Sequence, residues 1–226
     1  MSVPGAHLAS AQIIQRMMTE NQQRAARLEN YSAKRRYHLK YTGFPHTLEA
    51  SMDVEVTCGA PGAKSFRIVS ESGSKLLRER VLQKLLESEE EALKDPARSA
   101  LTTANYNFDL VATEGDAATP TYVFQVDPKH DSKFLYRGTI WVDGADFAVK
   151  RVQAEPAKNP SFWISKTAIA HTYIKIGQFW LPHHNQSDTK VRFGGVAALT
   201  IDYSGFHLNS PGDSPPVAAP DTTASR

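Results

Sequence analysis

The sequence lacks the cysteine patterns and short motifs that most often indicate a particular catalytic, metal-binding or nucleotide-binding site. It has one cysteine, Cys58, and therefore neither an internal disulfide nor a site made of several thiolates. The GxGxxG, P-loop, GxSxG and HExxH motifs are all missing. The eight histidines show no metal-ligand spacing, so we expect no metal, no cofactor and no catalytic residues.

The charge balance and the length of the apolar runs argue against two further classes of protein, nucleic-acid-binding proteins and proteins with a transmembrane helix. The 26 Lys and Arg residues are balanced by 24 Asp and Glu without a basic stripe, so we expect no nucleic-acid partner. No run of 18 or more apolar residues offers a transmembrane helix. The N-terminus lacks the charged segment and apolar run of a signal peptide, which leaves open a cytosolic protein or one whose signal peptide has been removed.

What the sequence does contain is a long series of strand patterns from Lys133 to Tyr203. Valine, isoleucine, threonine and aromatic residues are frequent there, and they favour the half-buried surface of a sheet. Asp143-Gly144 predicts a hairpin loop, and Gly177-Gln178 and Gly194-Gly195 predict reversals or bulges. Because short connections join the runs without an intervening helix, they predict an antiparallel meander.

Before that stretch, two amphipathic helices are separated by short strands. Apolar residues at helical spacing predict helices near 10–30 and 74–94. Between them, strict alternation over 31–41 and 47–58 predicts two strands with one wet face, and a third strand follows at 64–70. Strands resume after the second helix, at 106–112 and 121–126.

These patterns together predict a mainly β fold with covering helices, in the α+β class. We count about eleven strands, and so large an antiparallel sheet must curl into a half-barrel. Both helices are expected on its concave face, and residues 1–208 are expected to form a single domain. Residues 209–226 contain four prolines and no aromatic residue, which predicts a disordered tail.

The order of the elements and several segments resemble a known family. A helix, three strands, a helix and a long meander resemble the periplasmic lipoprotein-carrier fold of the LolA/LolB-like superfamily. The segments Asp127–Asp143, Asn159–Trp163 and Gly177–Pro182 are similar to bacterial proteins described as outer-membrane lipoprotein-sorting-like. This resemblance runs from Ser10 to Phe206 and implies a periplasmic protein whose signal peptide has been removed.

The resemblance also implies a type of function. Relatives carry the acyl chains of lipoproteins or lipids, or sense them as regulators. Well-known carriers of this family hold their lid with a particular arginine, for which Arg35 and Arg137 are the candidates in this sequence.

The concave face of such a sheet is either a packed core or, where helices leave space, a pocket of lipid size. We expect a pocket that binds an acyl chain. Its candidate residues come from the sheet and the second helix: Leu48, Met52, Val54, Phe134, Tyr136, Ile140, Leu77, Val81 and Leu85. The alternative is that these side chains meet and leave no room.

Three functions are compatible with these patterns. The first is a non-enzymatic, monomeric periplasmic carrier whose partners are a hydrophobic ligand or lipoprotein acyl chains. The second is an envelope sensor or adaptor on the same fold that binds a membrane-associated protein partner. A hydrolase using scattered His and Asp residues ranks below both, because no nucleophile–base pair is evident in the sequence.

Overall fold

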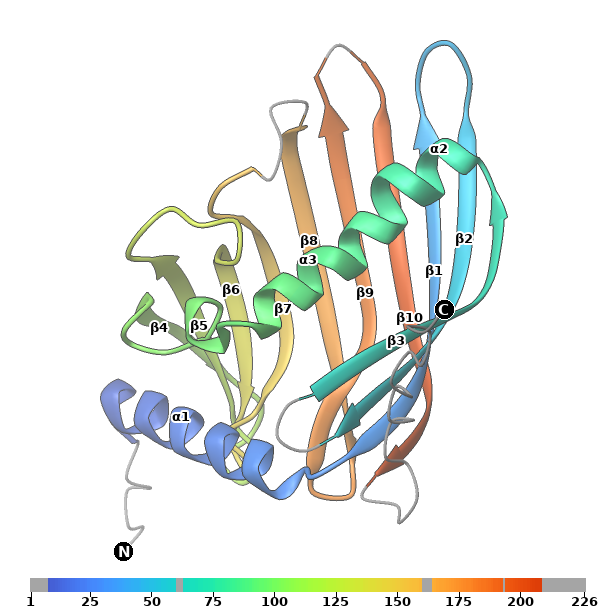
Figure 1. Ribbon diagram of the computed structural model, residues 1–226. Coiled ribbons are helices and arrows are strands. Elements are labelled where there is room, and N and C mark those ends of the chain that lie inside the picture. Colours follow the sequence, from blue (N-terminus) through green and yellow to red (C-terminus); the bar gives the residue numbers. More distant parts are fainter. Residues whose placement is uncertain (1–7, 60–62, 160–163, 193, 209–226) are drawn as a thin grey trace, which may run out of the picture.

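The computed structural model describes residues 8–59, 63–159, 164–192 and 194–208. Within them the chain builds one antiparallel sheet, which two helical segments cross (Figure 1). The strands are β1 (Tyr31–Thr42), β2 (Leu48–Gly59), β3 (Ala63–Gly73), β4 (Tyr106–Glu114), β5 (Thr121–Pro128), β6 (Tyr136–Asp143), β7 (Val149–Pro156), β8 (Ile164–Ile176), β9 (Phe179–Val191) and β10 (Val196–Leu208). The helical segments are α1 (Ser10–Arg27) and the continuous series α2 (Lys75–Leu77), η1 (Arg78–Leu82) and α3 (Gln83–Leu93), followed by the short η2 (Pro96–Arg98).

The described residues form ten strands, one fewer than the eleven counted from the sequence. Strands β8, β9 and β10 have 13 residues each, whereas a typical strand has about five or six, so a count of short runs gives too many strands. The expected reversals at 143–144, 177–178 and 194–195 are confirmed as the connections that follow β6, β8 and β9. The tail at 209–226 and the Phe162-Trp163 pair lie outside the described residues.

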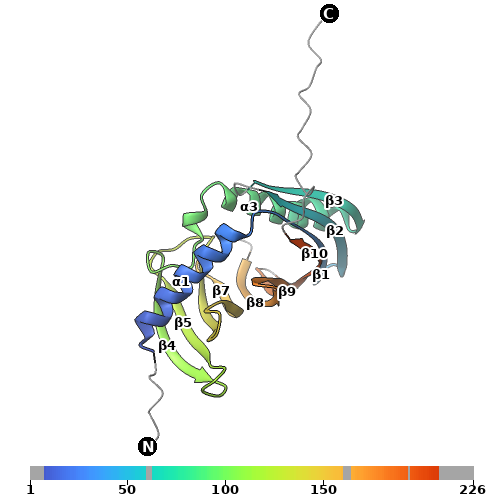
Figure 2. The same cartoon turned by 90° about the horizontal axis from the view of Figure 1, so that it is seen from below.

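The order of strands in the sheet is β3-β2-β1-β10-β9-β8-β7-β6-β5-β4. Its edges are β3 and β4, which are consecutive in the chain, so the segment between them must cross from one edge to the other. A helical segment from 75 to 93 is about 28 Å long, whereas ten flat strands would span about 43 Å. The curl of the sheet shortens this distance, and Figure 2 shows the helices lying inside the curve.

One row of cross-strand neighbours identifies the concave face. Neighbours in register point to the same side of a sheet, so the whole row shares one face. The row reads Met52, Tyr37, Ile201, Asn185, His171, Val152, Ile140 and Phe124. Its two ends are apolar and its middle, on β8 and β9, is polar.

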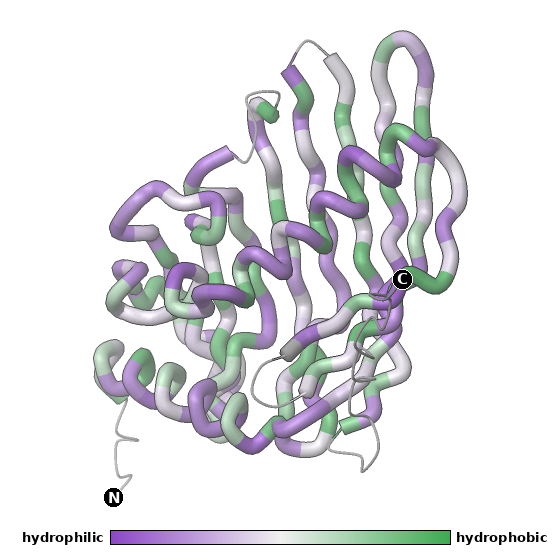
Figure 3. Tube along the Cα trace, viewed as in Figure 1, coloured by the Kyte–Doolittle hydropathy of each residue, from purple (hydrophilic) through white to green (hydrophobic). Residues whose placement is uncertain are grey.

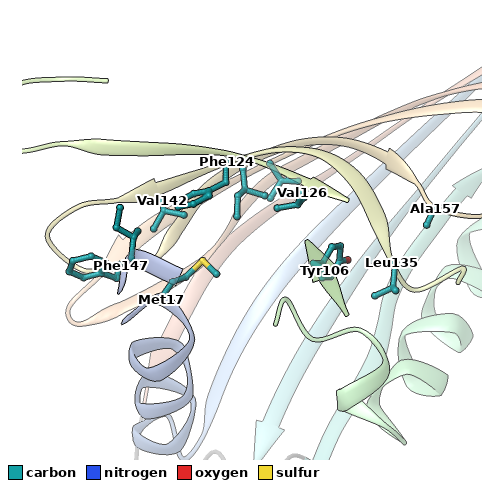
Figure 4. Close-up of a cluster of buried hydrophobic side chains, with 11 residues drawn as sticks. Met17, Tyr106, Phe124, Val126, Leu135, Val142, Phe147 and Ala157 are labelled. Atoms are coloured by element: carbon teal, nitrogen blue, oxygen red, sulfur yellow. The ribbon is translucent and has the colours of Figure 1, made fainter. Parts of the chain in front are cut away.

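Two hydrophobic clusters attach the helices to this face. In the α1 core, Ile13 and Met17 are at most 1% exposed and pack on β4–β7, as Figure 4 shows for Met17 beside Phe124 and Val142. In the α3 core, helical leucines pack on β1, β2 and β10: Tyr37, Leu39, Ala50, Met52, Val54, Val56, Leu77, Leu82, Leu86, Leu199 and Ile201. Both helices therefore lie on the concave face, as the sequence predicted.

A π-helical turn changes the buried face of the second helical segment. Leu77, Leu82 and Leu86 are buried, whereas Val81 and Leu85 are only half-buried. The π-turn η1 places residue i+5 where a regular α-helix would place residue i+4. The stripe expected from helical spacing is therefore displaced by one residue after Leu77, while hydrophilic positions still fill the outer side of the segment (Figure 3).

Candidate functional site

A cleft of about 450 Å³ lies between the C-terminal half of α1 and the concave face of the sheet. We call it the α1 cleft. The end of α1, the loop after η2, the start of β7 with the residue before it, and β9 contribute its apolar wall: Ala25, Leu28, Leu101, Ala148, Val149, Phe179 and Leu181. Phe179 and Leu181 are at most 6% exposed, yet they belong to neither core cluster. Their burial comes from the walls of the cleft.

Two tyrosines bring polar groups into the apolar α1 cleft. Tyr136 of β6 and Tyr173 of β8 both line it, and burial raises the pKa of each phenol. Within the described part of the chain, neither hydroxyl group has a hydrogen-bond partner. Both tyrosines are half-buried and neither hydroxyl is fully enclosed, so these groups can bond to water or to a ligand in the cleft.

The polar middle of the concave face lies beside this cleft. His171 of β8 and Asn185 of β9 are cross-strand neighbours there, between the two hydrophobic cores. Burial lowers the pKa of His171 to about 4, so its imidazole is neutral at neutral pH. Both side chains are only half-buried, which shows that the helices do not seal the central strands as they seal the ends.

An ion-pair cluster fastens α3 to the sheet. Arg35 of β1 is 6% exposed and makes two hydrogen bonds to Glu89 of α3, of 2.6 Å from Nη1 to Oε2 and 3.1 Å from Nη2 to Oε1. Lys64 of β3 donates to the same carboxylate. The second candidate for a lid-holding arginine, Arg137, lies on the convex face, 3.9 Å from Asp131. Arg35 is thus the candidate that contacts a covering helix.

The structure divides the nine predicted ligand-binding residues among three places. Six of them pack directly against one another in the α3 core: Leu48, Met52, Val54, Leu77, Val81 and Leu85. Tyr136 and Ile140 belong to the α1 core, and Tyr136 also lines the α1 cleft. Phe134 lies beside the cations of Arg98 and Lys133, 4.8 and 4.9 Å from its ring. Their role in binding remains a prediction, and Tyr136 is the one that the structure places in the cleft.

Sequence reasoning missed most of the cleft wall. Leu28, Leu101 and Leu181 meet there from three distant parts of the chain, and none of them forms a local motif with another. The available signal was the segment Gly177–Pro182, which carries part of the family resemblance and contributes Phe179, Trp180 and Leu181 to the cleft.

The described residues bear on two kinds of reactive site, a metal cluster and a nucleophile–base pair. No group of three metal-ligating side chains occurs among them, and neither long helical segment there combines the length and apolar character of a membrane crossing. His38 and Ser51 do form a nucleophile–base pair that the sequence did not reveal, with 3.2 Å between Nδ1 and Oγ. This pair joins neighbouring strands on the exposed face of the sheet, an arrangement typical of structural cross-strand contacts.

Comparison of the sequence with family models and with curated proteins finds no match. Solved structures similar to this chain include a LolA superfamily protein from Nitrosomonas europaea, at 11% identity over 88% of this chain and 95% of that one, with a TM-score of 0.38. A DUF1329 family protein from Desulfovibrio piger is 10% identical over 88% and 92% of the two chains, with a TM-score of 0.44. An outer membrane lipoprotein-sorting protein domain from Vibrio parahaemolyticus is 12% identical over 85% and 92%, with a TM-score of 0.42.

At these identities and TM-scores, the similarities carry no part of the functional argument. The expected order of one helix, three strands, a second helix and a long meander is present in this chain. The functional argument rests on its own cleft and contacts.

Proposed function

We propose that this protein binds an acyl chain or a similar apolar ligand in the α1 cleft and carries it without chemical change. The observation that supports this most is the pairing of an apolar wall with two phenols, Tyr136 and Tyr173, that lack partners in the described residues. The volume of about 450 Å³ lies within the range of small-molecule sites, about 300–1,000 Å³.

The hydrophobic effect supplies part of the free energy that micromolar binding in such a cleft requires, about 8 kcal/mol in total. Each CH₂ group removed from water contributes about 0.8 kcal/mol, so eight methylenes contribute about 6 kcal/mol before the entropic costs of association. The phenol groups of Tyr136 and Tyr173 would add hydrogen bonds to an ester or carboxyl group at the end of the chain. A ligand of this kind fits both the apolar and the polar parts of the wall.

The ion-pair cluster of Arg35, Glu89 and Lys64 has a structural role in the proposed carrier. Arg35 and Glu89 keep α3 across the concave face while the middle of that face stays half-open. We infer that this contact holds the covering helix in position during binding and release. A periplasmic location, and a role in handling lipoproteins like the sorting for which the Vibrio parahaemolyticus domain is named, also belong to the proposal.

A cleft-filling substitution tests the carrier function. Ala25 lines the α1 cleft and is exposed, so Ala25→Trp should fill the cleft while leaving the fold intact. Ala26 is the next residue of α1, is equally exposed and does not line the cleft, which makes Ala26→Trp a matched control. A fluorescent fatty acid is titrated into the wild type and both variants, and their melting temperatures are compared.

We expect the probe to bind the wild type and Ala26→Trp, with binding to Ala25→Trp weakened about tenfold or more. Mass spectrometry should recover the probe unchanged, whereas turnover of the probe would contradict a carrier. If the wild type fails to bind any acyl probe at tens of micromolar, the carrier function is wrong. The adaptor, whose partner is another protein, then becomes the leading explanation of the fold.

A further inference from the structure

A second, polar cleft of about 600 Å³ lies on the other side of the C-terminal half of α1. Its walls are α1, the loop between β6 and β7, and the turn between β8 and β9. We call it the basic cleft, because four cationic side chains line it against two carboxylates. The cations are Arg16, Arg24, Arg27 and Lys175, and the carboxylates are Glu20 and Asp146.

One carboxylate of the basic cleft is already engaged. Asp146 Oδ2 lies 2.6 Å from Nζ of Lys175 and accepts a hydrogen bond of 2.8 Å from the indole of Trp180. These contacts hold the pKa of Asp146 below its ordinary value, with the hydrogen bond from Lys175 as the largest cause. Lys175 and Asp146 therefore neutralise each other, and the excess positive charge comes from the arginines of α1.

Arg24 is held in place by neutral groups. Its Nη1 donates to the backbone carbonyl of Asp146 at 2.7 Å, and its Nη2 donates to Asn21 Oδ1 at 2.6 Å and to the carbonyl of Phe147 at 3.3 Å. No carboxylate of the described residues forms an ion pair with it. Burial lowers the pKa of its guanidinium, which shows that part of its hydration is lost.

Arg16 lies about two helical turns before Arg24 and forms no direct ion pair within the described residues. Within the described ranges it makes neither a hydrogen bond nor an ion pair, and its guanidinium lies 5.1 Å from the centre of the Phe147 ring. Stacking on an aromatic ring orients an arginine without cancelling its charge. Asp146 and Glu20 act on Arg24 only at a distance, and four cations against two carboxylates leave the cleft with a net positive charge that can attract an anion.

The two clefts meet at Arg24, which lines both of them. Trp180 lines the α1 cleft and bonds to Asp146 in the basic cleft, so the two walls are also joined by a hydrogen bond. We propose that the basic cleft binds the anionic headgroup, a phosphate or a carboxylate, of an amphiphile whose acyl chain lies in the α1 cleft. This inference rests on the proposed carrier function and adds the orientation and charge of its ligand.

Three lipids with one myristoyl chain each test this inference by isothermal titration calorimetry. Lysophosphatidylglycerol is anionic, lysophosphatidylcholine is zwitterionic and monoacylglycerol is neutral, while glycerol 3-phosphate tests for binding of a free anion. The variants are Arg16→Gln, which is exposed and should not disturb folding, and Arg24→Gln, whose melting temperature is measured in parallel. Arg80→Gln, an exposed arginine on η1, is the control.

We expect the anionic lipid to bind at least about tenfold more tightly than the other two, as one charge-assisted contact would give. Both cleft variants should reduce this preference. Arg16→Gln, which lines only the basic cleft, should leave the affinity for monoacylglycerol unchanged, and Arg80→Gln should have no effect. The preference should also shrink at about 1 M salt, where the Debye length falls to about 3 Å.

Other outcomes would overturn the inference in distinguishable ways. Equal binding of all three lipids, or an equal loss for all three in Arg16→Gln, refutes the headgroup site and leaves the carrier standing. Binding of glycerol 3-phosphate as tight as that of the anionic lipid identifies a site for free anions instead. If none of the lipids binds, the carrier function fails and this inference fails with it.

Discussion

Removing the carboxylate of Glu89 should release α3 from the sheet, because Arg35 and Lys64 would both lose their anionic partner. Arg35 is 6% exposed and Glu89 is 30% exposed, so the arginine of the pair is buried and the carboxylate is partly exposed to solvent. Removing one partner of a buried ion pair costs about 3–5 kcal/mol of stability. Because Glu89 is partly exposed, we expect Glu89→Ala to lower the free energy of unfolding by about 3 kcal/mol, the lower end of this range. In a domain of about 200 residues this corresponds to a fall in melting temperature of about 6–12 °C.

Thermal unfolding followed by circular dichroism measures this loss. The matched control is Glu87→Ala on the same helix, whose carboxylate contacts Lys84 at the surface with both side chains more than half exposed. Such exposed pairs contribute little, so the control should melt within about 2 °C of the wild type. Replacing Arg35 by Met and Glu89 by Leu together should recover most of the loss, because no unpaired charge remains buried.

The dependence on pH gives the same prediction a second test. Burial alone would raise the pKa of Glu89, but the hydrogen bond from Arg35 and the charge of Lys64 outweigh it and lower the pKa. A lowered pKa in the folded state means that the stabilisation is complete above the ordinary carboxyl pKa and is lost as the pH falls through the folded value. The melting-temperature gap between wild type and Glu89→Ala should therefore be constant near neutrality and narrow in acid. A gap that is absent at pH 7, or equal to that of Glu87→Ala, would refute the fastening role.

Three further predictions concern the concave face. Met52→Glu should destabilise the protein by at least about 3 kcal/mol, because Met52 is 1% exposed. Glu49→Lys, on the solvent-exposed face of the same strand, should change the melting temperature little, and equal melting temperatures of the two variants would show that the faces are inverted. Ile140→Lys should unfold or severely destabilise the α1 core, in which Ile140 has no exposed surface. Chemical denaturation measures this, and a variant as stable as the wild type would contradict the prediction. The folded pKa of His171 is lowered to about 4, so the unfolded chain binds this proton more readily and stability is lost as the pH falls from about 6.5 to about 4. His171→Gln should reduce that loss, and an unchanged dependence of stability on pH would contradict this.

The sequence predicted the sheet better than it predicted the cleft, for a physical reason. Side chains on a strand alternate with a period of two, so one apolar residue such as Met52 determines the face of all its neighbours. Both helices were also predictable from their amphipathic spacing, and their concave location follows from the apolar side that they must bury. The fold class therefore depends on local patterns that the sequence carries.

The helix register and the cleft depend on contacts that local patterns do not contain. The π-turn η1 interrupts the regular period, so Leu82 and Leu86 replaced the expected Val81 and Leu85 on the buried side. Arg35 stood out as a charge on an apolar face, but its partner Glu89 is 54 residues away and could be found only from the packed structure. The cleft walls likewise come from distant segments and from the way the sheet curls.

Native mass spectrometry of the protein after gentle purification tests the central claim most directly. The carrier account predicts that the wild type and Ala26→Trp retain a noncovalent lipid whose acyl chain is chemically intact, and that Ala25→Trp, with its α1 cleft filled, emerges without it. An empty wild type that also takes up no added acyl lipid, or identical lipid adducts on all three proteins, would contradict the account.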